Sequence, residues 1–67
     1  MLYYVNKNPQ TNWDHEVHTA NCERLPNVEN RIYLWSFESC KQAIQAAKRI
    51  YPTADGCAHC CPVCHTS

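Results

Sequence analysis

The sequence has no long hydrophobic run, and this lack limits the classes of protein to which it can belong. No apolar segment approaches the 18 or so residues that a membrane-spanning helix needs. The segment Met1–Lys7 also lacks the charged start and the apolar stretch of a secretory signal peptide. We therefore expect a cytoplasmic protein that does not associate with membranes.

An excess of charge of either sign is also missing. Six basic and six acidic residues give a net charge of zero. A domain that binds nucleic acid by electrostatics is usually basic overall, and this chain is not. Internal repeats and low-complexity segments are absent as well. The sequence thus predicts a single small domain, 1–67, with DNA only as a weak candidate partner.

The chain also has too few residues to build a large core. Ordering 67 residues at about 1.5 kcal/mol each costs on the order of 100 kcal/mol, which a core of this size offsets only to near zero. What the sequence does contain is six cysteines and four histidines. In a reducing compartment, closely spaced cysteines are more often metal ligands or catalytic thiols than disulfides. We expect a metal ion to supply the missing stability.

Hydrophobic patterning predicts an α+β fold, with two or three short antiparallel strands and one main helix. Strands are expected at 3–5 and 16–18, and the alternating segment 31–35 is the expected central strand. The helix is expected from about Cys40 to Ile50, with Ser39 as its N-cap in an S-x-x-Q capping box. The eleven residues after Gly56 show no periodicity and are expected to form a loop.

Several side chains outside the expected metal site have simpler interpretations. Cys40 lies on the apolar stripe of the helix, so we expect a core residue there. The histidines outside the expected site are predicted to be exposed: His15, His59 and His65. Four aromatic residues are expected in the core rather than on a base-stacking surface: Trp13, Tyr33, Trp35 and Phe37.

The spacing of cysteine and histidine residues predicts a tetrahedral zinc site. His18-x3-Cys22 supplies one candidate ligand pair. The segment after Gly56, called the tail below, contains Cys57-x2-Cys60 and Cys61-x2-Cys64. A C-x2-C pair lets two thiolates converge on one ion, and structural zinc takes four such ligands. Cys57/Cys60 and Cys61/Cys64 compete as the second pair, and Cys57/Cys64 and Cys60/Cys64 remain open. Either Asp14 or Glu16 is expected to orient the histidine through its other ring nitrogen.

The order of these motifs resembles the Ada-type metal-binding domain, a small zinc domain found in a bacterial alkylation-repair protein and in stand-alone relatives. The matching segments are Tyr4–Lys7, His18-x3-Cys22, Phe37-x-Ser39-x3-Ala43 and Cys57-x2-Cys60-x-Pro62. The resemblance covers most of the chain and implies a ligand set of His18, Cys22, Cys57 and Cys60. In the repair protein, a zinc-bound cysteine at the first position accepts a methyl group from DNA. Here His18 takes that position and has no thiolate, so the activity is not expected to carry over.

The sequence therefore predicts a small zinc module with a structural or interaction role and no catalytic residues. We expect a monomer whose partner is either DNA, by the family resemblance, or protein. The alternative is a thiol-based activity, either a redox dithiol or an alkyl acceptor, that uses the tail cysteines. Such an activity needs a reactive thiolate outside the metal site. Cys61 and Cys64 are the residues left for it, or for an alternative metal site, and Cys60 is a further candidate.

Overall fold

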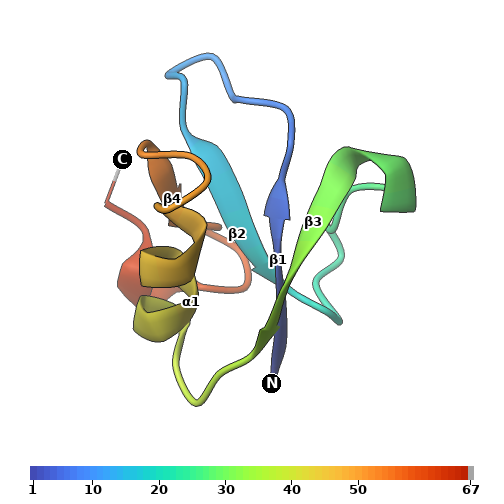
Figure 1. The fold of residues 1–67 in the computed structure, drawn as a ribbon, viewed down its shortest axis with the longest axis vertical. Coiled ribbons are helices and arrows are strands. Elements are labelled where there is room, and N and C mark those ends of the chain that lie inside the picture. Colours follow the sequence, from blue (N-terminus) through green and yellow to red (C-terminus); the bar gives the residue numbers. More distant parts are fainter. Residues whose placement is uncertain (67) are drawn as a thin grey trace.

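The computed structural model, which describes residues 1–66, shows one helix packed on a four-stranded sheet (Figure 1). The strands are β1 (Leu2–Asn6), β2 (His15–Thr19), β3 (Arg31–Ser36) and β4 (Ala54–Gly56), in the spatial order β3-β1-β2-β4. The helix α1 (Cys40–Ala47) contacts all four strands. Short 3-10 helices occupy Val28–Asn30 and Pro62–Cys64. The predicted α+β class is confirmed.

The sheet is mixed, and it contains one strand that the patterning did not reveal. Strand β1 pairs antiparallel with both β2 and β3, whereas β4 runs parallel to β2. β4 has only three residues, Ala-Asp-Gly, and shows no alternation because all three are buried. It positions the cysteine-rich tail beside β2.

The predicted central strand is an edge strand. Segment 31–35 lies within β3, which pairs only with β1, while β1 and β2 occupy the middle of the sheet. The two apolar faces of this segment suggested burial on both sides. In the fold only Leu34 is buried, and Tyr33 and Trp35 point into solvent. The prediction was wrong because aromatic side chains satisfy strand propensity on an exposed edge as well as in a core.

The core lies between the sheet and one face of α1. Tyr3, Val5, Val17 and Leu34 project from the sheet against Ala43 and Ala47 of the helix. Ser39 caps the helix as predicted, since its hydroxyl accepts a hydrogen bond from the Gln42 backbone N–H (3.4 Å). The Gln42 side chain accepts from the Glu38 N–H rather than from that of Ser39. The helix ends at Ala47, before the predicted Ile50.

Two expectations about individual side chains are corrected. Trp13 and Trp35 are 72% and 69% exposed and are not core residues, although Phe37 does pack against the core. His15 is half-buried rather than exposed, because its ring stacks on Tyr51 with a centroid separation of 3.7 Å. His65 is also half-buried rather than exposed, with its Nδ1 atom 2.9 Å from the Gly56 carbonyl oxygen, whereas His59 is exposed as predicted.

Candidate metal centre

Strand alternation places His18 on the face of the sheet opposite α1. Val17 points into the core, so the next residue, His18, points to the other side. The side chain is nevertheless only 1% exposed. It is buried among Cys22, which follows β2 after a short turn, and Cys57 and Cys60 from the tail.

The parallel pairing of β2 with β4 brings the tail to His18. Gly56 is the register partner of Val17, and the backbone N–H of Cys57 then donates to the Val17 carbonyl (3.0 Å). A turn closed by the Cys61 N–H on the Cys57 carbonyl (2.8 Å) returns Cys60 to the same place. Backbone hydrogen bonds thus join two segments that are far apart in the sequence.

Four ligand atoms converge at this point. One atom each of His18, Cys22, Cys57 and Cys60 lies within 4.8 Å of the other three. The Nδ1 atom of His18 is 4.0 Å from the Cys60 sulfur. In a zinc tetrahedron with bonds of about 2.0–2.3 Å, the ligand atoms stand about 3.6–3.8 Å apart, so the cluster has the dimensions of a metal site.

Backbone amides point at all three sulfur atoms of the cluster. The Arg24 N–H donates to Cys22 Sγ (3.4 Å), the His59 N–H to Cys57 Sγ (3.4 Å), and the Thr19 N–H to Cys60 Sγ (3.3 Å). Hydrogen bonds of this kind stabilise the charged thiolate. A metal ion binds thiolates rather than thiols, so these amides stabilise the form of the three cysteines that binds metal.

Burial opposes the charged forms of Cys22 and His18. Burial is the main cause that raises the pKa of the Cys22 thiol, and the neighbouring Cys60 adds to it. Burial likewise lowers the pKa of His18 below its ordinary value, which favours the neutral imidazole that binds metal. Three adjacent thiolates need a cation to compensate their charge, and the cluster has the donor set to bind one.

The second ring nitrogen of His18 has no hydrogen-bond partner among residues 1–66. Its Nε2 atom is completely buried and lies 3.6 Å from Glu16 Oε1, just beyond hydrogen-bond distance. The carboxylate of Asp14 instead accepts a hydrogen bond from Asn12. If Nδ1 ligates a metal, Nε2 must carry the proton, and Glu16 is the acceptor that faces it. Glu16, rather than Asp14, therefore has the position of the orienting residue.

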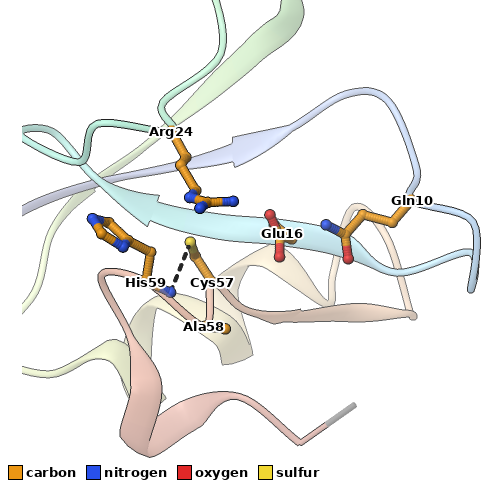
Figure 2. A pocket seen from close by; sticks show the side chains of 6 residues that line it. All are labelled: Gln10, Glu16, Arg24, Cys57, Ala58 and His59. Carbon is orange, nitrogen blue, oxygen red and sulfur yellow. Dashed lines mark hydrogen bonds between the residues drawn. The ribbon is translucent and has the colours of Figure 1, made fainter.

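A hollow of about 260 Å³ opens beside the cluster (Figure 2). Cys57 lines it together with Glu16, Arg24 and His59, with Gln10 at its far end. A metal site needs an access path for the ion. This hollow reaches a ligand of the cluster and has both acidic and basic side chains on its walls.

The remaining cysteines are placed differently from the sequence expectations. Cys64 is disulfide-bonded to Cys40, so it neither pairs with Cys61 nor joins the four-residue cluster. Cys40 packs against the core as predicted, but it is half-buried and oxidised rather than a free core thiol. Cys61 is a free thiol, 2% exposed, on the core side of the tail. Burial, followed by the nearby Cys60, raises its pKa to about 12.

No family model, curated protein or solved structure matches this chain. None of the helices in residues 1–66 has the length and hydropathy needed to span a membrane. What the structure establishes is therefore a small domain with a histidine and cysteine cluster that could hold a metal ion.

Proposed function

We propose that this protein is a structural and interaction module whose fold is stabilised by a bound zinc ion. The observation that carries the proposal is the convergence of four ligand atoms from His18, Cys22, Cys57 and Cys60 within 4.8 Å. Zinc fits the set because three sulfurs and one nitrogen form one of its usual structural donor sets. With all four protein ligands in place, no position remains open for a substrate or a reactive water.

The ion joins the two ends of the chain. His18 and Cys22 belong to the N-terminal half, and Cys57 and Cys60 to the tail. Structural zinc contributes about 10–16 kcal/mol of apparent binding free energy at neutral pH. A contribution of that size would supply the stability that the small core does not provide.

A thiol-based activity has less support. Cys64 is held in a disulfide with Cys40, and the buried Cys61 thiol has a pKa of about 12. A thiol with so high a pKa contains very little reactive thiolate at neutral pH.

We further propose that the chain is a distant relative of the Ada-type metal-binding domain. Support comes from the agreement between the ligand set that the resemblance implies and the four residues that converge. With an imidazole in the first ligand position, transfer of a methyl group to that residue is not part of the proposal.

Native mass spectrometry of the full chain, with and without a chelator, tests the zinc proposal. We expect one metal ion per chain, and cobalt substitution should give the absorption bands of tetrahedral coordination with thiolate ligands. His18→Gln should weaken metal retention, whereas His59→Gln, which changes an exposed histidine outside the cluster, should not. A folded chain that contains no metal would overturn the proposal.

A further inference from the structure

On the sheet face opposite α1, a row of half-buried and exposed side chains begins near the metal centre and runs across β1 and β3. We call it the aromatic ladder: Arg31, Tyr4, Tyr33 and Trp35. The guanidinium carbon of Arg31 lies 4.6 Å from the Tyr4 ring centroid. Tyr4 and Tyr33 follow with centroids 5.3 Å apart, and Tyr33 and Trp35 with centroids 5.1 Å apart. Tyr4 is the register partner of His18, so the ladder adjoins the metal cluster.

An irregularity in β3 extends the ladder to Trp35. Tyr4 pairs with Tyr33 and Tyr3 pairs with Trp35, which leaves Leu34 as an extra residue between them. Trp35 has a φ of 92°, a backbone conformation that side chains other than glycine rarely adopt. Although Trp35 is paired with the buried Tyr3, its ring lies beside Tyr33 and is 69% exposed. The bulge thus places a large aromatic ring in solvent.

We propose that the aromatic ladder binds a proline-rich segment of a partner protein that carries an acidic residue beside its prolines. The inference rests on the proposed function only in that it takes the chain to be an interaction module. Proline-rich segments adopt the polyproline II helix and bind in aromatic-lined grooves. The centroid separations of 5.3 and 5.1 Å set three aromatic rings along a stretch of the sheet whose length is comparable to one polyproline II turn, about 9 Å.

The ring geometry favours prolines over stacked bases. The Tyr4 and Tyr33 planes are inclined by 44°, and those of Tyr33 and Trp35 by 56°. Because the planes are inclined, the three rings do not present one flat stacking surface, whereas the prolines of a polyproline II segment can pack against separate aromatic side chains. Nucleic acid would also require a set of cations for its phosphates, and the ladder contains one.

The polar groups of the ladder match the needs of such a ligand. Among residues 1–66, the Tyr4 and Tyr33 hydroxyls and the Trp35 indole N–H have no hydrogen-bond partner. A polyproline II segment has no internal hydrogen bonds, so its carbonyls are free to accept from these donors. One nitrogen of Arg31 donates to the Pro26 carbonyl (3.0 Å), which fixes the guanidinium and leaves other N–H groups for a carboxylate.

An NMR titration of the metal-loaded full chain tests the inference. The probe is an oligoproline peptide with a pair of glutamates at one end, and the reference is a glycine-serine peptide of the same length and charge. We expect the Trp35 indole signal to shift with the proline probe only, while the Trp13 signal stays in place. Trp35→Ala should weaken binding about tenfold or more, as expected for a tryptophan at the centre of an interface.

Trp13→Ala is the matched control, because Trp13 is 72% exposed and also has a positive φ of 72° but lies outside the ladder. It should leave the affinity unchanged. Arg31→Gln should weaken binding of the glutamate-bearing probe but not of uncharged oligoproline. If Trp35→Ala fails to fold, Tyr33→Phe and Arg31→Gln still test the ladder.

The inference is overturned if the proline probe does not bind the wild-type chain or binds no better than the glycine-serine peptide. It is equally overturned if Trp13→Ala weakens binding as much as Trp35→Ala, or if oligothymidylate shifts the Trp35 signal and oligoproline does not. Metal content is measured separately on the same sample. Loss of metal binding would refute the zinc proposal, and failure of the peptide to bind would refute the ladder alone.

Discussion

Cys40, the first residue of α1, is disulfide-bonded to Cys64, which closes the tail that carries Cys57 and Cys60. The tail is therefore fixed at two places, by the metal-ligand cluster on one face of the sheet and by the helix on the other. The two attachments differ in chemistry, since one is a cluster of side chains that could hold a metal ion and the other is a disulfide bond.

We expect Cys40→Ser to lower the free energy of unfolding of the oxidised protein by about 3 kcal/mol, because the bond closes a loop of intermediate length in the unfolded chain. Urea denaturation with and without a dithiol reductant measures the effect. The reductant should destabilise the wild type and leave the variant unchanged. Equal stability of the wild type in both conditions would contradict the prediction.

Lowering the pH should release the metal and destabilise the fold together. Burial depresses the pKa of His18 below its ordinary value of 6.5, so the folded state favours the neutral ring. The resulting stability is fully present above the pKa that His18 has in the unfolded chain, and it is lost as the pH falls below that value. Protonation of His18 also removes a metal ligand. Metal content and thermal unfolding followed across pH 8 to 4 should fall in parallel. Metal release without loss of stability would contradict the proposal that the metal ion stabilises the fold.

The cysteines should differ in their reactivity with an alkylating reagent at neutral pH. We expect slow modification of Cys61 even after chelation, because the pKa of its buried thiol is about 12. Cys22, Cys57 and Cys60 should resist alkylation until a chelator removes the metal. Peptide mapping by mass spectrometry distinguishes the sites. Rapid labelling of Cys61 in the native metal-loaded chain would show that the tail is more open than the structure indicates.

Gly56→Ala should destabilise the protein, by about 1–3 kcal/mol for an overpacked site. A Cβ atom at Gly56 would lie 2.9 Å from the backbone carbon and Cβ of Cys64 and 3.0 Å from the Cys61 carbonyl oxygen. These atoms belong to the tail backbone and to the disulfide, so they cannot move aside easily. A thermal melt of the variant measures the loss, and an unchanged melting temperature would show that the tail adapts.

The sequence by itself determined the elements whose local signals are strong. The capping serine and the apolar stripe of Ala43 and Ala47 predict α1, and the aromatic and β-branched residues of 3–5 predict β1. The strand character of 16–18 already separated Val17 from His18, which places one in the core and the other on the opposite face. Spacing alone left the second ligand pair open among the tail cysteines.

Only the tertiary structure decided which cysteines meet. The three-residue strand β4 has no periodicity to detect, yet its parallel pairing with β2 brings Cys57 and Cys60 to His18. The same arrangement leaves Cys64 under the start of α1, where it bonds to Cys40. The exposure of Tyr33 and Trp35 was likewise set by the position of β3 at the edge of the sheet. Spacing specifies which residues can share an ion, but long-range backbone pairing determines which of them are brought within reach.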